Sequence, residues 1–122
     1  MTELRIVRIF LLAQAAIFVV AVSIHFGWQF TGYQHRAAGT AESIIACVLI
    51  TGLLLTWSRW ARVAAIAAQS FGVLGVLVGL FTIAVGVGPR TALDLAIHAL
   101  MLVVLIAGLV VTVKRPGRAP AG

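Results

Sequence analysis

Four long apolar runs, joined by short polar connections, constrain the fold of this chain more than any other feature. They cover about residues 9–28, 38–57, 63–87 and 91–113. A helix that crosses a hydrocarbon core of about 30 Å needs roughly 20 residues, and each run is about that long. We therefore predict an all-α fold, in which residues 1–122 form one integral membrane domain with four transmembrane helices and a flexible tail at 116–122.

The Lys and Arg residues are distributed unevenly around these runs. Seven of the nine lie at the end of the predicted bundle that holds both termini, and only Arg36 and Arg90 lie in the other two connections. Cytoplasmic loops retain Lys and Arg, so we predict a bacterial cytoplasmic-membrane protein with both termini inside the cell. The net charge of +6 is explained by this pattern and by anionic lipid, so a nucleic-acid partner is not expected.

The two halves of the chain resemble each other. Residues 48–59 align with residues 104–115 at a spacing of 56, and seven of the twelve positions are identical, including a Gly, a Thr and an Arg. Gln14 and Gln69 correspond with a one-residue offset, and we expect them to hydrogen bond between helices. The pattern favours two duplicated helical hairpins, although convergence of two apolar helices would also produce it. At the same spacing, Glu42 corresponds to His98, so these two side chains are expected to approach each other.

Glycines recur along one side of the third run. Small residues let helices approach closely in a membrane, where lipid offers no hydrophobic drive for helix association. We expect these glycines to face either the rest of the bundle or a second copy of the chain, in a homo-oligomer or a larger membrane complex. They are Gly72, Gly75, Gly79 and Gly86.

Four ionisable residues fall in the outer half of the predicted bundle: His25, Glu42, Asp94 and His98. Ionisable groups inside membrane spans are costly, so each is a candidate for binding a ligand or a proton. Asp94 and His98 are four residues apart and share a helix face, where the carboxylate would help to hold the imidazole. A structural interpretation competes with this one. Asp94 would then cap its helix, and Arg36 and Arg90 would be charge partners of the two acids on the outer rim.

No set of residues with the spacing of a catalytic or metal site is present, so we expect no metal and favour a protein that is not an enzyme. Haem would need two histidines facing each other at similar depth, and His25 and His98 are the only candidate pair. A bound quinone is the other cofactor considered.

The segment from Gly39 to Glu42, the late Gly52 and the basic turn at Arg59 and Arg62 resemble the second span of DoxX-like membrane proteins. The resemblance covers about residues 39–75, and His25, Asp94 and His98 are not part of that family's core pattern. It implies a four-helix membrane protein of similar length, associated with quinone-coupled sulfur or thiol oxidation as an accessory subunit.

Three functions are therefore carried forward. The first is a non-catalytic accessory subunit of a membrane redox complex that binds a partner or a small ligand. The second is a dimeric proton-coupled transporter of small solutes that uses Glu42. The third is a subunit that holds haem or quinone.

Overall fold

The computed structural model describes residues 2–30, 32 and 34–114. This part of the chain contains four helices and no strand: α1 (Thr2–His25), α2 (Arg36–Leu55), α3 (Ala61–Ala84) and α4 (Ala92–Lys114). All four are long and apolar enough to cross a membrane. The protein is a multi-pass membrane protein with a four-helix bundle fold, as the apolar runs predict. The expected flexible tail at 116–122 lies outside the described residues.

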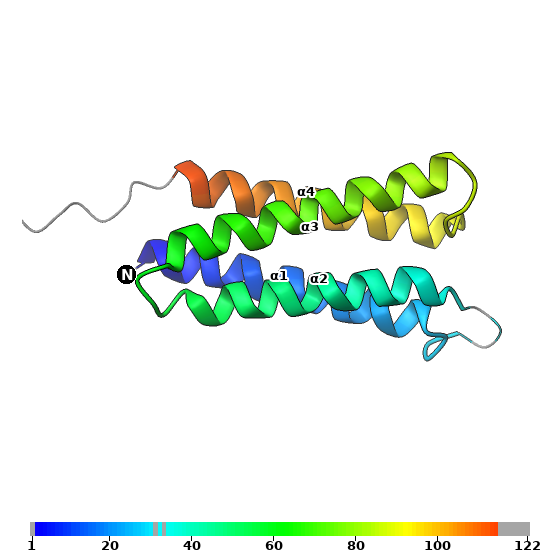
Figure 1. Cartoon of the computed structure of the whole chain (residues 1–122), viewed down its shortest axis with the longest axis horizontal. Coiled ribbons are helices and arrows are strands. Elements are labelled where there is room, and N and C mark those ends of the chain that lie inside the picture. The colour runs from blue at the N-terminus through cyan, green and yellow to red at the C-terminus, as the bar shows by residue number, and fades with distance from the viewer. Residues whose placement is uncertain (1, 31, 33, 115–122) are drawn as a thin grey trace, which may run out of the picture.

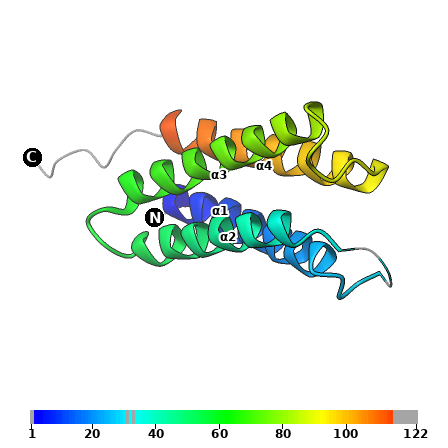
Figure 2. The ribbon, with the colours of Figure 1, turned by 45° about the vertical axis from the view of Figure 1, so that its right-hand side comes forward.

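Consecutive helices run antiparallel and form two hairpins, α1–α2 and α3–α4, that lie against each other (Figure 1). The start of α1, the α2–α3 turn and the end of α4 share one end of the bundle, which we call the terminal end. The connections 26–35 and 85–91 share the other end, which we call the distal end (Figure 2). All four ionisable residues singled out above lie in the distal half.

The helix bounds differ from the apolar runs by a few residues for identifiable reasons. Helix α1 begins at Thr2, before the apolar run, because a helix can continue beyond the hydrocarbon core into the polar interface. It ends at His25 because Gly27 follows with φ +80°. Helix α3 ends at Ala84, and Gly86 adopts φ +86° in the turn that follows. Gly86 is therefore a turn glycine, not a residue of the helix-packing face on which the sequence placed it.

The core is narrow and depends on small residues where helices meet. Its middle layer contains Leu11, Leu49 and Leu105, all with no exposed surface. A Cβ atom added at Gly72 would lie 2.8 Å from a methyl group of Leu105, and one added at Gly75 would overlap the end of Ile45. These two glycines therefore face the protein's own bundle, which decides between the two orientations left open by the sequence.

The outside of the bundle is apolar along most of its length. Large side chains such as Leu12, Leu74 and Val103 are exposed, as expected for a surface in contact with lipid tails. At the terminal end, the guanidinium of Arg8 lies 4.1 Å from the ring centre of Trp57, and that of Arg59 lies 5.0 Å from the ring centre of Trp60. Paired cations and aromatic rings are typical of the membrane–water interface.

Candidate functional site

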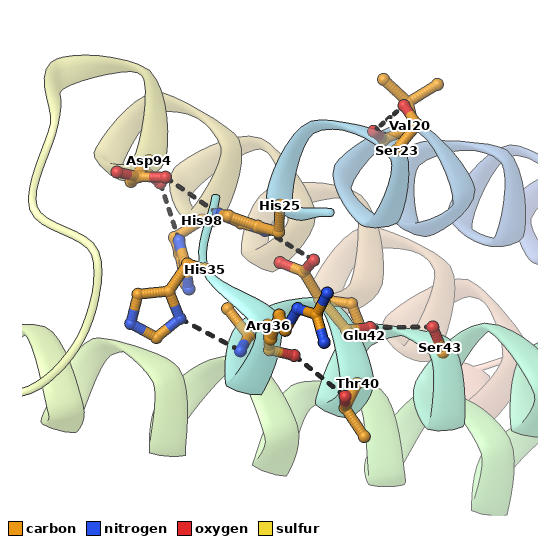
Figure 3. Close-up of polar contacts among 12 residues, drawn as sticks. Val20, Ser23, His25, His35, Arg36, Thr40, Glu42, Ser43, Asp94 and His98 are labelled. Carbon is orange, nitrogen blue, oxygen red and sulfur yellow. Dashed lines mark hydrogen bonds and ion pairs between the residues drawn. The ribbon is translucent and has the colours of Figure 1, made fainter. Parts of the chain in front are cut away.

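His25 is the central residue of a buried polar chain at the distal end. It is the last residue of α1 and has no exposed surface. Its Nδ1 lies 2.6 Å from Oε2 of Glu42 on α2, and its Nε2 lies 2.9 Å from Oδ1 of Asp94 on α4. Figure 3 shows the imidazole between the two carboxylates. One side chain thus connects three helices.

The two contacts of His25 determine how many protons the group holds. Each hydrogen bond needs a proton between a ring nitrogen and a carboxylate oxygen, whereas a neutral imidazole carries only one on its two nitrogens. The three side chains therefore share two protons. They form either an imidazolium between two carboxylates or a neutral imidazole next to one carboxylic acid. In both arrangements the net charge of this Glu42–His25–Asp94 chain is −1, and a proton can shift along it without leaving the group.

Asp94 also closes the first turn of α4. Its Oδ2 accepts hydrogen bonds from the backbone N and the hydroxyl of Thr91, at 2.9 and 2.6 Å, and its own backbone N donates to Thr91 Oγ1. This reciprocal arrangement is a helix-capping box, and a carboxylate is favoured at this helix end. The expected capping role is therefore confirmed, but the same carboxylate also binds His25. Asp94 performs both roles because its two oxygens point in different directions.

A cavity of about 270 Å³ lies next to the Glu42–His25–Asp94 chain, between α2, α3 and α4. Four polar side chains line it: Glu42 and His98, which are each only 6% exposed, and the half-buried His35 and Thr82. The buried residues Phe18, Val76 and Met101 supply apolar wall. Glu42 therefore takes part in the buried chain through one carboxylate oxygen and reaches the cavity as well.

The geometry defines the tautomer of the neutral His98 ring. Its Nδ1 lies 2.7 Å from the main-chain oxygen of Asp94, one turn earlier in α4. A carbonyl oxygen only accepts hydrogen bonds, so Nδ1 carries a proton and the neutral ring has its lone pair on Nε2. That Nε2 faces α3 at Gly79, where an added Cβ would lie only 2.8 Å away. Glycine at position 79 thus makes room for the imidazole. No described residue hydrogen bonds to this nitrogen.

The distal connection closes over His25. The backbone N of His35 donates to the main-chain oxygen of His25 at 2.7 Å, and its Nδ1 accepts from the backbone N of Ala38 at the start of α2. The two imidazole rings meet edge to face, with centres 6.5 Å apart. Phe26 packs against Gly39, where an added Cβ would come within 3.1 Å of the ring. These contacts keep water away from the His25 side chain.

The structure brings together the residues that the sequence selected, with different partners. Glu42 and His98 share one cavity, as the repeat suggests, while His25 rather than His98 receives both carboxylates. The expected side-chain pairing of Asp94 with His98 is wrong, because His98 bonds to the main chain of Asp94. Arg36 and Arg90 are exposed, and among the described residues neither forms an ion pair with Glu42 or Asp94.

A second buried polar group lies towards the terminal end. Gln14 Nε2 donates to Gln69 Oε1 at 2.8 Å and to the main-chain oxygen of Val104 at 3.1 Å. Gln69 Nε2 donates to Thr112 Oγ1 at 2.9 Å. The expected hydrogen bond between the two glutamines is confirmed. These residues pack directly against Gly108, where an added Cβ would overlap both amide groups. The group therefore holds α1, α3 and α4 together, and neither glutamine lines the distal cavity.

The histidines do not have the geometry of a haem site. Both ring nitrogens of His25 are engaged by carboxylates, so coordination of iron would require at least one of these hydrogen bonds to break. Within residues 2–30, 32 and 34–114, no group of three or more His, Cys, Asp and Glu side chains is arranged to hold a metal ion. Cys47, in contrast, lies exposed on the lipid-facing side of α2, away from the cavity.

Comparisons with protein-family models, with curated proteins and with solved structures find no match for this chain. The resemblance of residues 39–75 to DoxX-like proteins stays a prediction.

Proposed function

We propose that this protein binds a small ligand in its distal cavity, and that it does so in the bacterial cytoplasmic membrane as a non-catalytic accessory subunit of a redox complex. One observation supports this proposal most directly. Glu42 is almost fully buried and hydrogen bonded to His25, yet it also lines a cavity that His98 shares. Ionisable groups buried at membrane depth are expensive, so a cavity lined by two of them favours a binding role.

The orientation proposed from the basic residues places this cavity on the outer side of the membrane. The terminal end holds most of the basic residues of the described part of the chain, and the positive-inside rule assigns that end to the cytoplasm. These residues are Arg5, Arg8, Arg59, Arg62 and Lys114. The protein would then bind its ligand in the outer half of the bilayer. The link to a redox complex rests on the resemblance to DoxX-like proteins alone.

A dimeric proton-coupled transporter is the second candidate, and the Glu42–His25–Asp94 chain favours it because a shared proton can move along the chain. The packing between the cavity and the terminal end argues against it. There, Leu11, Leu49 and Leu105 have no exposed surface, and Gln14 and Gln69 are buried and hydrogen bonded to each other. A transporter would need a second conformation that opens this layer. Proton-coupled flux into liposomes that is abolished by Glu42→Gln would support transport.

The test of ligand binding is native mass spectrometry of protein extracted gently from its own membrane. We expect a bound small molecule on the wild-type protein and its loss from Glu42→Gln. The matched control is Ser43→Ala, because Ser43 is the next residue of α2, bonds only to the main chain of its own helix and does not line the cavity. Equal retention by all three proteins would contradict a role of Glu42, and no bound molecule on any of them would contradict the proposed function.

A further inference from the structure

We infer that the ligand of the distal cavity is a lipid-dissolved molecule with a neutral aromatic hydroxyl head group, such as an alkylphenol. The inference rests on the proposed function, because it names the chemical class of the ligand for the same cavity. It follows from three properties of the cavity: what its polar atoms can accept, where it opens, and how large it is.

The two buried polar residues of the cavity, Glu42 and His98, offer hydrogen-bond acceptors. The less buried His35 and Thr82 also line it: the Thr82 hydroxyl donates to the main-chain oxygen of Gly79, and the neutral His35 ring, whose Nδ1 accepts from Ala38 N, has an N–H at Nε2 that can donate to a ligand oxygen. His98 Nδ1 donates to the main-chain oxygen of Asp94, so the neutral ring offers only the lone pair of Nε2. Glu42 uses Oε2 for His25, and in both arrangements of the two shared protons its other oxygen carries no hydrogen. No described residue donates to either acceptor. A ligand that supplies an O–H group would satisfy them, whereas a ligand with acceptors only would leave them without a partner.

The cavity borders the distal connection, where Val87 and Pro89 line it, and its side opens towards lipid between α2 and α3. Its rim includes Ala37 and Ala41 on α2 and Val78 on α3, all of which are exposed. Val78 lies six residues before the end of α3, which places this part of the rim about 9 Å below the helix end at 1.5 Å per residue. The opening therefore reaches the hydrocarbon region of one leaflet. A ligand that enters here comes from the bilayer.

Size and charge narrow the class further. The volume of about 270 Å³ is just below the roughly 300–1,000 Å³ of sites that enclose drug-sized ligands, so it suits a single ring with its tail left in the lipid. Phe18 and Met101 provide an apolar wall for such a ring. A carboxylate head group is disfavoured because the net charge of −1 on the Glu42–His25–Asp94 chain would repel it. An ammonium head group would have to lose its water on the way through an apolar opening.

The experiment measures equilibrium binding of radiolabelled 4-octylphenol to the protein in phosphatidylcholine nanodiscs, with empty nanodiscs subtracted. The competitors are unlabelled 4-octylphenol, its methyl ether, which has the same ring and tail but no donor, and octylammonium. We expect the ether to compete about ten-fold less well than the phenol, the effect of roughly 1.4 kcal/mol in hydrogen bonding. We expect Glu42→Gln to weaken phenol binding by a similar factor, because an amide nitrogen replaces one carboxylate oxygen, and Ser43→Ala to leave it unchanged.

Each result has a defined meaning, provided that circular dichroism and a single elution peak show the variants to be folded. Equal competition by the phenol and its ether, or tighter binding of octylammonium, would overturn the ligand class and leave ligand binding in the cavity intact. Absence of phenol binding would also overturn the ligand class if native mass spectrometry finds another molecule that depends on Glu42. If neither experiment finds a ligand, the proposed function fails together with this inference.

Discussion

The Nδ1 atom of His25 lies 2.6 Å from a carboxylate oxygen of Glu42, although the two residues are 17 positions apart and belong to different helices. A second carboxylate, that of Asp94, reaches the other side of the same ring from α4. The distal end of the bundle is thus held by polar bonds where it lacks a wide apolar core. This arrangement makes His25 important for stability as well as for the electrostatics of the cavity.

Replacing His25 by Leu should destabilise the protein strongly. The change leaves two buried carboxylates without their shared partner, and loss of one member of a buried ion pair typically costs about 3–5 kcal/mol. The free energy of unfolding, measured in mixed micelles with increasing SDS, should fall by an amount in this range.

Two further variants separate the charge effect from a general loss of packing. His35→Asn retains a side-chain acceptor for the Ala38 backbone N and should change stability by less than about 1 kcal/mol. Adding Glu42→Gln and Asp94→Asn to His25→Leu should restore part of the lost stability, because neither of the two carboxylates that faced His25 then remains. If the triple variant is less stable than His25→Leu alone, the charge argument is wrong.

The protonation of the two buried histidines should differ in a way that nitrogen NMR detects. In ¹⁵N spectra of histidine-labelled protein in lipid, the neutral form of His98 should carry its proton on Nδ1, which faces the main-chain oxygen of Asp94. Both nitrogens of His25 should report hydrogen-bonded protons, because each faces a carboxylate. Asp94→Asn should change the His25 signals and leave the tautomer of His98 unchanged, since His98 bonds to the main chain at position 94. A neutral His98 protonated on Nε2 would contradict the proposed set of acceptors in the cavity.

The fold could be predicted from the sequence because membrane helices must satisfy their own backbone hydrogen bonds. Length and hydropathy alone then identify four spans, and the short connections make consecutive helices antiparallel. The residues of the site were predictable for a similar reason. Glu42, Asp94 and the two histidines are ionisable, and burying them in a membrane span costs free energy whatever the rotation of their helices. The duplication of the two hairpins stays a prediction.

The pairing within the site could not be predicted, because it depends on helix rotation and on where each helix ends. His25 reaches both acids because α1 ends there and the connection folds back, so that the backbone N of His35 bonds to its main-chain oxygen. A change of one residue in the end of α1 would turn the ring by about 100°. Thr91 was missed altogether, although a Thr three residues before Asp94 at a helix start is the signal of a capping box.

Replacing Gly79 by Ala should impair the cavity more than it impairs the fold. The new methyl group would lie 2.8 Å from His98 Nε2, so the imidazole must shift away from the position in which its lone pair is available to a ligand. We expect ligand retention in native mass spectra to fall at least about ten-fold. The matched control is Gly72→Ala, two turns earlier in α3, because its methyl group would lie 2.8 Å from a methyl group of Leu105 and neither residue lines the cavity. Equal ligand loss in both variants would indicate a general packing effect instead.

The glutamine group predicts unequal costs for two similar changes. Gln69 accepts from Gln14 and donates to Thr112 Oγ1 and to the main-chain oxygen of Ala65, whereas Gln14 Oε1 is buried without a partner among the described residues. Hydrogen bonds between membrane helices contribute on average about 0.6 kcal/mol. Gln14→Leu removes two bonds and also the unpartnered oxygen, so we expect a loss of at most about 1 kcal/mol. Gln69→Leu should cost about 1 kcal/mol more in the same SDS titration, and the opposite order would contradict these assignments.

The orientation of the distal end can be decided with two single cysteines in a Cys47→Ala background. Cys47 lies on the exposed side of α2, and its replacement by Ala removes a labelling site without touching the core. Gln29→Cys places a thiol in the exposed distal connection, and Ser58→Cys places one in the exposed turn at the terminal end. Since the basic residues assign the terminal end to the cytoplasm, a maleimide that cannot cross membranes should label only the first variant in intact spheroplasts. Both should react after the cells are broken. Labelling of the Ser58→Cys variant alone in intact spheroplasts would reverse the orientation and place the ligand cavity in the inner leaflet, facing the cytoplasm.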